Sequence, residues 1–454
     1  MTERRWSSRF GFVLGAVGAA VGLGSIWRFP YLAGAGGGFA FILVFVVACL
    51  VFGVPVLVGE IVIGRWSRRS PPEAAGALAA RAGYAVSAWN AVGWSGSAAG
   101  FLIVTYYTMI AGWVLAYTWF FLTGDFARGG AMAAAERFHV FTADAPAVTL
   151  WQVGFLALVA LTSASGLNRG VEFANRWRAP ALLAILLVLV VYSLTTGDVA
   201  RGLHFAFHPD LRRLTPDVLL EAVGQALFAL GISAGIMIVY GSYMPAGESI
   251  RRSVAAVIGS IFLVSLLATL AIFPLVFRYG LNPASGPELV FQVLPAAFAE
   301  MPGGRLIGTL FFALLVLAAF TPTVGLFEVP IAWLSGKFGV ARPVAAGLVA
   351  GAGLLLGHGS VLSFGRLGDW HPLAGVPRLG TMNFFSLCDF AAASVLMPLS
   401  ALLVSVFVGW RIGNRIPPEE LSGLSPLEWR LLLFALRFLC PVGIALVLAV
   451  GLAG

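Results

Sequence analysis

The chain alternates between long apolar blocks and short polar segments. A helix that crosses a lipid bilayer needs about 20 mostly apolar residues. Eleven blocks come near this length, at about residues 10–34, 38–64, 84–123, 149–166, 178–196, 217–244, 253–279, 304–335, 343–358, 384–410 and 431–453. This pattern predicts an all-α polytopic membrane protein with about 11 transmembrane helices.

Glycines interrupt two of these blocks near their middles. The first block reads G-A-V-G-A-A-V-G-L-G-S at 15–25, and the sixth reads F-A-L-G-I-S-A-G at 228–235. Glycine weakens a helix by about 1 kcal/mol relative to alanine, and unwound backbone at membrane depth must line a cavity or be buried in protein. Glycine at nearly every fourth position from Gly11 to Gly22 also suits close helix packing, so a purely structural interpretation stays open.

The position of the two interruptions favours unwinding. They fall in spans one and six, which indicates two five-helix halves in inverted topology. We expect the first repeat at about 10–198, the second at about 217–410 and an additional helix at about 431–453, all within one transmembrane domain over 1–454. In transporters built this way, the broken helices bind substrate and ions near the membrane midplane.

Composition narrows the class of protein further. Hydrophobic residues make up 59% of the 454 residues and charged residues 11%, against about 25% charged in a soluble domain. So few polar residues exclude a soluble enzyme and a disordered regulator. Uninterrupted apolar blocks also exclude a β-barrel, whose strands alternate polar and apolar residues. The spans contain no nucleophile–base pair or metal cluster, so we do not expect an enzyme.

The 28 basic residues, against 20 acidic ones, are dispersed among short loops. They form no dense patch, so we expect membrane lipid around the protein and no nucleic acid; the sequence indicates no obligate protein partner. Loops on the side of the N-terminus hold the excess of Lys and Arg, with Arg65, Arg178 and Arg342 among them. The positive-inside rule then places the N-terminus in the cytoplasm and the C-terminus outside.

Several motifs resemble those of the neurotransmitter:sodium symporters. They are A-V-G-L-G-S-I-W-R-F-P-Y at 20–31, G-V-P-V-L-V-G-E-I-V-I-G-R at 53–65, V-T-Y-Y at 104–107, G-Q-A-L-F-A-L at 224–230, G-I-M-I-V-Y-G-S-Y at 235–243, L-A-A-F-T at 317–321 and D-F at 389–390. The resemblance covers nearly the whole chain. It implies the eleven-helix bacterial form of this symporter fold, in the bacterial inner membrane, with alternating-access uptake of an amino acid or amine driven by an ion gradient.

The resemblance also implies a substrate site. The amides of Leu23 and Gly24 and the hydroxyl of Tyr107 would hold the substrate carboxylate, and backbone carbonyls would accept from its ammonium group. The implied substrate site comprises Ala20, Leu23, Gly24, Ile103, Tyr107, Phe228, Ala229, Gly231, Ala234, Pro322 and Leu326. Small residues at Gly231 and Ala234 predict a roomy apolar pocket, which favours a bulky hydrophobic or aromatic amino acid.

Gates are implied at both ends of this site. Arg28 and Asp389 would form an outer gate with Gln225 close by, although a permanent structural ion pair is the alternative. Trp6 and Tyr243 would form the inner gate.

Two acidic residues in the spans have separate interpretations. We expect a structural role for Glu60, as an acceptor for the unwound sixth helix. We expect Glu328 at a helix end that faces the cytoplasm, with a proton carrier as the alternative.

The implied ion sites differ from the family pattern. At the first sodium site Ser25 keeps an oxygen, but Ala229 and Ile261 do not, and a hard cation needs oxygen ligands. The second site keeps Gly18, Val21, Ala318 and Thr321, while Pro322 replaces a second hydroxyl. We therefore expect sodium at the second site at most.

Chloride is not expected either. Gln225 and Ser265 match a chloride site, but Phe45 stands where a tyrosine is usual. A proton-coupled or ion-independent transporter and a non-transporting amino-acid sensor are the alternatives.

Overall fold

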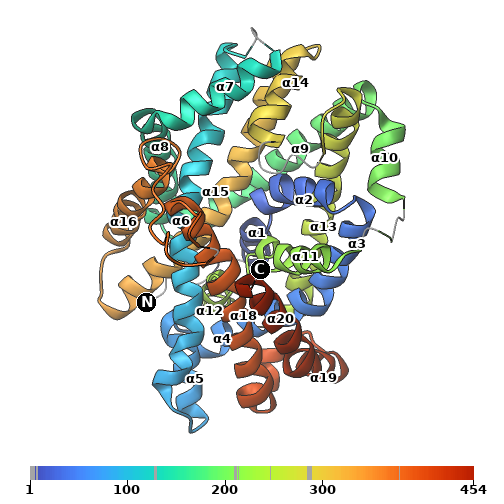
Figure 1. Ribbon diagram of the computed structural model, residues 1–454. Coiled ribbons are helices and arrows are strands. Elements are labelled where there is room, and N and C mark those ends of the chain that lie inside the picture. Colours follow the sequence, from blue (N-terminus) through green and yellow to red (C-terminus); the bar gives the residue numbers. More distant parts are fainter. Residues whose placement is uncertain are drawn as a thin grey trace.

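The computed structural model describes residue 6 and residues 9–126, 130–208, 212, 214–245, 247–283, 289–377 and 379–453. Within these residues every regular element is a helix (Figure 1). The elements of the first half are α1 (Arg9–Ala20), η1 (Gly24–Arg28), α2 (Phe29–Ala35), α3 (Phe39–Ala48), η2 (Cys49–Gly53), α4 (Val54–Ser67), α5 (Pro71–Arg81), α6 (Val86–Thr123), α7 (Gly130–Ala143), α8 (Ala145–Ala164), η3 (Leu167–Glu172), α9 (Phe173–Thr196) and α10 (Val199–Phe207).

The second half repeats a similar series of long and interrupted helices. Its elements are α11 (Pro216–Ala229), α12 (Ile236–Ser242), α13 (Ile250–Arg278), η5 (Leu289–Val293), α14 (Leu294–Glu300), α15 (Gly304–Lys337), α16 (Arg342–Leu362), α17 (Phe384–Asp389), η6 (Phe390–Leu396), α18 (Met397–Val406), η7 (Phe407–Ile412), η8 (Gly413–Arg415), η9 (Pro418–Leu421), α19 (Pro426–Phe434), η10 (Ala435–Leu439) and α20 (Cys440–Ala453).

The first and sixth expected spans are both broken in the structure. Helix α1 ends at Ala20, and the chain resumes at Gly24 with a change of direction of 46°. The sixth span consists of α11 and α12, with 14 and 7 residues, and each is too short to cross a bilayer alone. Figure 1 shows these green helices beside the blue α1 and α2 at the centre of the bundle. The prediction of two broken helices is confirmed.

Nine helices are apolar and long enough to cross a membrane in the described part of the chain, or ten with the bent α1–α2 pair. The interrupted α11–α12 span completes the eleven that the sequence predicts. The ends differ because polar residues next to an apolar block can continue the same helix. For example, the span expected at 178–196 begins at Leu167.

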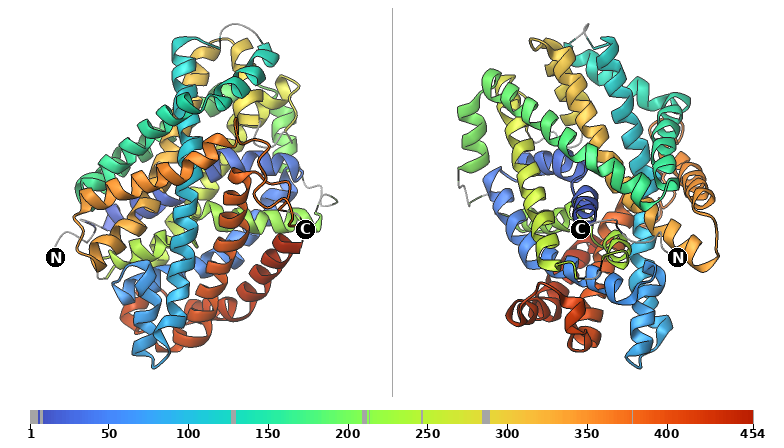
Figure 2. Two further views of the ribbon diagram at one scale, coloured as in Figure 1. Left: turned by 60° about the vertical axis from the view of Figure 1, so that its left-hand side comes forward. Right: turned by 180° about the vertical axis from the view of Figure 1, so that it is seen from behind.

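Long helices surround the broken ones. Helices α6 and α15 pack along each other through the centre, and α8 and α16 pack together against α6. Figure 2 shows α8 and α16 running side by side at a slant to α6. Four shorter helices, α5, α7, α10 and α14, connect the spans and were not predicted.

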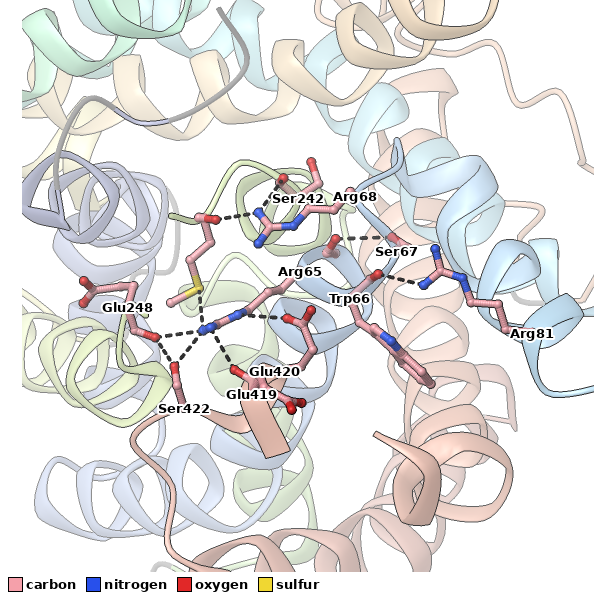
Figure 3. Close-up of polar contacts among 12 residues, drawn as sticks. Arg65, Trp66, Ser67, Arg68, Arg81, Ser242, Glu248, Glu419, Glu420 and Ser422 are labelled. Carbon is pink, nitrogen blue, oxygen red and sulfur yellow. Dashed lines mark hydrogen bonds and ion pairs between the residues drawn. The ribbon is translucent and has the colours of Figure 1, made fainter. Parts of the chain in front are cut away.

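Arg65 connects the end of α4 to two other segments of the chain. Its side chain is 2% exposed, and it donates to the carbonyls of Glu248 and Glu419 at 2.7 and 3.1 Å (Figure 3). It also donates to Ser422 Oγ and to Glu420 Oε2, each at 3.0 Å. Arg65, which the sequence analysis counted only as a topology signal, therefore also joins three segments of the chain.

Replacement of Arg65 by glutamine should lower the stability of the protein. Hydrogen bonds to charged groups contribute about 1.5–3 kcal/mol each, and we expect a net loss of about 2–4 kcal/mol because glutamine keeps only part of the network. Thermal unfolding in detergent, followed by tryptophan fluorescence, measures this loss. The matched control is Arg81→Gln, because the exposed Arg81 makes one hydrogen bond to the Trp66 carbonyl. Equal shifts of the two variants would contradict the assignment.

Candidate functional site

The break between α11 and α12 is held by left-handed backbone and by a buried carboxylate. Gly231 and Gly235 have φ of 62° and 78°, and Ser233, between them, has φ of 68°, which is uncommon for a residue with a side chain. The Ser233 amide donates to Glu60 Oε1 at 2.7 Å, and Glu60 is completely buried. The prediction that Glu60 accepts from the unwound sixth span is confirmed.

A cavity of about 40 Å³ lies where the two broken spans meet. All eleven residues expected around the substrate line it. Four lining residues were missed by the sequence analysis, namely Ala19, Gly22, Ile236 and Met397. Ala19 and Gly22 are next to Ala20 and Leu23, and Ile236 lies two residues after Ala234, but no motif in the sequence marks Met397, which enters from α18.

Few polar groups line this cavity. The Leu23 amide donates to the Tyr107 hydroxyl at 3.5 Å, which is a long hydrogen bond that a better acceptor can replace. Gln225 Nε2 donates to the Gly24 carbonyl at 2.7 Å and holds the break in the first span. The site therefore offers backbone amides beside one hydroxyl in an otherwise apolar surface.

The cavity is much smaller than the roomy pocket that the sequence predicts, so that prediction is wrong for this conformation. The Phe228 ring lies against Gly24, where its Cδ1 would be 3.0 Å from an added Cβ. The Pro322 ring approaches Gly22 in the same way, at 2.7 Å. Gly231, on which the prediction of a roomy pocket rests, lies against the backbone of the first span, where an added Cβ would be 3.1 Å from the Ala19 carbonyl oxygen.

A larger cavity of about 500 Å³ adjoins the small one. Leu23, Gly24, Tyr107 and Phe228 line both cavities. Aromatic side chains form much of the larger cavity, and Trp113 makes edge-to-face contacts with Phe291 and Phe364. Movement of the Phe228 ring would join the two cavities, since it lies at their boundary.

Arg28 and Asp389 both line the larger cavity. Between these two described residues the structure has no hydrogen bond or ion pair, so the expected closed outer gate is not formed. The Arg28 guanidinium instead lies 4.8 Å from the centre of the Phe228 ring, in a cation–π arrangement. Gln225 binds Gly24, as described above. This end of the bundle is open.

The opposite end of the site is closed. Trp6 is 3% exposed and stacks edge-to-face on Tyr240, with ring centres 5.2 Å apart. Its amide donates to the Tyr243 carbonyl at 3.4 Å. The structure therefore brings together Trp6 and Tyr243, the two residues expected at the inner gate.

A partly buried ion pair supports this closed end. Glu328 is fully buried within α15 and pairs with Arg342 at the start of α16. The Tyr243 hydroxyl also donates to Glu328 Oε1, at 2.9 Å. The expected helix-end position of Glu328 is wrong, because α15 continues to Lys337. Arg342, counted among the loop charges, is the first residue of α16.

The residues implied at the second sodium site lie close together. The Thr321 methyl group comes within 2.6 Å of the point where Gly18 would carry a Cβ. Pro322 lies inside α15, and a proline donates no hydrogen bond to the carbonyl four residues earlier. The Ala318 carbonyl is therefore free of its helical donor, and the Thr321 hydroxyl is buried with no partner among the described residues.

The residues implied at the first sodium site offer fewer oxygen ligands than those of the second site. Ser25 Oγ is buried and makes no hydrogen bond to any described residue, while Ala229 and Ile261 are buried apolar side chains. In the implied chloride site, Phe45 packs on Phe29 with ring centres 4.8 Å apart. Ser25 is thus the only one of these three first-site residues with a side-chain oxygen, and Phe45 brings no hydroxyl to the implied chloride site.

One charged residue beside the second site was misassigned. Arg178, counted among the loop charges, is 6% exposed in α9 and donates to the Leu317 carbonyl. Its neighbour Arg176 is exposed. The sequence gives no signal that separates the two, because burial depends on the packing of α9 against α15.

Comparison with known proteins agrees with this geometry. A model of the sodium:neurotransmitter symporter family matches residues 3–134 and 144–451. The chain is 36% identical to the uncharacterized sodium-dependent transporter YhdH of Bacillus subtilis over 98% of both chains. It is 31% identical to an uncharacterized sodium-dependent transporter of Haemophilus influenzae, over 92% of this chain and 91% of the other.

A solved structure shows the same fold. The crystal structure of MhsT in complex with L-phenylalanine matches with a TM-score of 0.88 and 36% sequence identity. The match covers 98% of this chain and 99% of the MhsT chain. The chain is therefore a multi-pass membrane protein with the inverted-repeat symporter fold, and it belongs to the sodium:neurotransmitter symporter family.

Proposed function

We propose that this protein is a secondary transporter that imports a hydrophobic or aromatic amino acid by alternating access, with coupling to sodium through at most one site. The observation that carries the proposal is the cavity between the two broken spans, open toward Arg28 and closed toward Trp6. The site is thus accessible from one end of the bundle in this conformation. We assign the Trp6 end to the cytoplasm and the Arg28 end to the exterior of a bacterial inner membrane.

The proposed substrate contacts use the polarity of the broken helices. The Leu23 and Gly24 amides lie at the start of the η1–α2 segment, and the positive end of a helix favours an anion such as a carboxylate. The Tyr107 hydroxyl already lies 3.5 Å from the Leu23 amide, so both can donate to one carboxylate. Carbonyls of Ala20, Phe228 and Ala229 are proposed as acceptors for the ammonium group.

A bulky side chain fits the combined space better than a small one. Ile103, Leu326 and Met397 give the small cavity apolar walls, and displacement of the Phe228 ring would connect it to the larger cavity. MhsT, which shares the fold, has been crystallised with L-phenylalanine. We therefore take L-phenylalanine as the first substrate to test.

The ion sites support at most one sodium ion. Ser25 alone offers a side-chain oxygen at the first site, whereas the second site combines the free Ala318 carbonyl with Thr321 and the end of α1. Relatives named sodium-dependent transporters favour sodium over protons as the coupling ion. The alternative outside the transporters is a non-transporting amino-acid sensor with the same pocket.

Counterflow in proteoliposomes tests transport without assuming a driving ion. Vesicles loaded with unlabelled L-phenylalanine should accumulate external labelled L-phenylalanine, because a carrier exchanges substrate across the membrane. Protein-free vesicles are the control, and separate uptake under a sodium gradient, a proton gradient or neither identifies the coupling ion. Binding of L-phenylalanine without counterflow would favour the sensor.

Competition among the twenty amino acids tests the substrate class. Large apolar amino acids should displace labelled L-phenylalanine about 10–100 times better than glycine or alanine, because full burial of such a side chain contributes about 1.5–3 kcal/mol. Scintillation proximity binding to purified protein gives the order. A preference for glycine or alanine would refute the proposed class.

Tyr107→Phe tests the proposed carboxylate contact. Loss of the hydroxyl should weaken L-phenylalanine binding about 10–100-fold, since a hydrogen bond to a charged group contributes about 1.5–3 kcal/mol. Tyr192→Phe is the matched control, because the Tyr192 hydroxyl bonds to the Pro302 carbonyl at 2.9 Å, away from the cavity. Unchanged affinity in Tyr107→Phe would remove Tyr107 from the site.

A further inference from the structure

The Arg178 side chain lies beside Gly18 and Thr321, two residues of the proposed second sodium site. Its Nη2 atom comes within 2.9 Å of the position where Gly18 would carry a Cβ, and the Thr321 methyl group comes within 2.6 Å of that position. Asn175 Oδ1 approaches it to 2.9 Å as well. A glycine at position 18 therefore makes room for a guanidinium group directly beside the proposed sodium ligands.

Arg178 is a buried cation without an acidic partner. It is 6% exposed, and none of the ion pairs between described residues includes it. Its Nη1 donates to the Leu317 carbonyl, one residue before Ala318, while its Nε has no hydrogen-bond partner in the part of the chain that the structure describes. An unpaired charge at membrane depth is costly, so local dipoles must stabilise it.

The surrounding backbone supplies such dipoles. Helix α1 ends at Ala20, and the carbonyls of its last turn carry the negative end of the helix dipole. On the other side, Pro322 frees the Ala318 carbonyl within α15. Together with the Thr321 hydroxyl, these oxygens form an environment that favours one positive charge.

A second positive charge in this environment is strongly disfavoured. Two unit charges about 4 Å apart, at an effective dielectric constant of about 20, repel enough to lower an affinity roughly a thousandfold. No acidic side chain among the described residues pairs with Arg178 and relieves this repulsion. Arginine also stays charged in proteins, so loss of its proton cannot remove the repulsion of a sodium ion.

We propose that the Arg178 guanidinium is a tethered cation that takes the place of sodium at the second site. The protein then binds its amino acid without a sodium ion there, and the single possible sodium site of the proposed function is filled by the chain itself. This inference rests on the proposed function, since it concerns ion coupling in the same transport cycle. An arginine that only marks the end of a span would extend into solvent, as the exposed Arg176 does.

Binding of ²²Na⁺ to purified full-length protein tests the proposal. Wild type should not bind ²²Na⁺ at the second site, so the Thr321→Ala substitution should leave its ²²Na⁺ binding unchanged. Arg178→Met should bind ²²Na⁺ with an affinity up to about a thousandfold higher, because the repulsion is lost, and Thr321→Ala in that background should remove the binding again. Arg176→Met is the matched control and should behave as wild type, while Arg178→Lys, which keeps the charge, should not gain binding.

Two results would overturn the proposal. One is ²²Na⁺ binding in wild type that Thr321→Ala abolishes, which requires no variant of Arg178 and so remains decisive if Arg178→Met fails to fold. The other is a folded Arg178→Met protein that gains no ²²Na⁺ binding.

Binding of L-phenylalanine in sodium or choline buffer, on the same preparations, separates this test from that of the proposed function. Equal affinity in both buffers for wild type, and a sodium requirement in Arg178→Met, are expected. If L-phenylalanine does not bind at all, the proposed substrate fails, while the ²²Na⁺ comparison still decides the role of Arg178.

Discussion

The structure depends on one constraint, which is that backbone polar groups cannot be left unsatisfied inside a lipid bilayer. Two of the eleven spans are nevertheless broken, and both breaks lie within the protein interior. Glu60 accepts from the Ser233 amide in one break, and Gln225 donates to the Gly24 carbonyl in the other. Other groups pair within the breaks, as the Ser25 amide does with the Gly22 carbonyl and the Gly231 amide with the Phe228 carbonyl, each at 3.1 Å. The Leu23 amide donates to the Tyr107 hydroxyl beside the cavity, where a polar ligand can replace that bond.

The same low-polarity environment determines where charges are found. Glu328 and Arg342 neutralise each other at the closed end, and Arg65 is surrounded by carbonyls and hydroxyl and carboxylate oxygens at the end of α4. Arg28 lies over an aromatic ring next to a large cavity. Arg178 differs from Arg342 and Arg65, because it has no acidic partner among the described residues, and from Arg28, because it donates to a backbone carbonyl rather than lying on an aromatic ring. That difference makes it the strongest candidate for a charge with a function.

Much of the fold could be predicted from the sequence, because bilayer thickness sets the length of an apolar block and glycine marks a weak point in a helix. The eleven residues around the small cavity follow from local motifs in the two broken spans, together with α6 and α15. Met397 and Arg178 could not be found in this way, since each reaches the site from another helix through tertiary packing. The volume of the cavity, predicted from the small residues Gly231 and Ala234, was also misjudged. Gly231 packs against the Ala19 backbone, and the rings of Phe228 and Pro322 occupy space beside Gly24 and Gly22.

The count of Lys and Arg in the loops shows the same limit of prediction from sequence. Arg65, Arg178 and Arg342 look identical to loop arginines such as Arg176 when only the sequence is considered, because each follows or precedes an apolar block. Their burial arises from interactions over long separations, as between Arg65 and Glu420 or between Arg178 and Leu317. The positive-inside count therefore mixes charges that face water with charges that hold helices together. In a protein with so few charged residues, the buried Arg65 and Arg178 and the partly buried Arg342 show that topology signals and packing interactions are carried by the same residues.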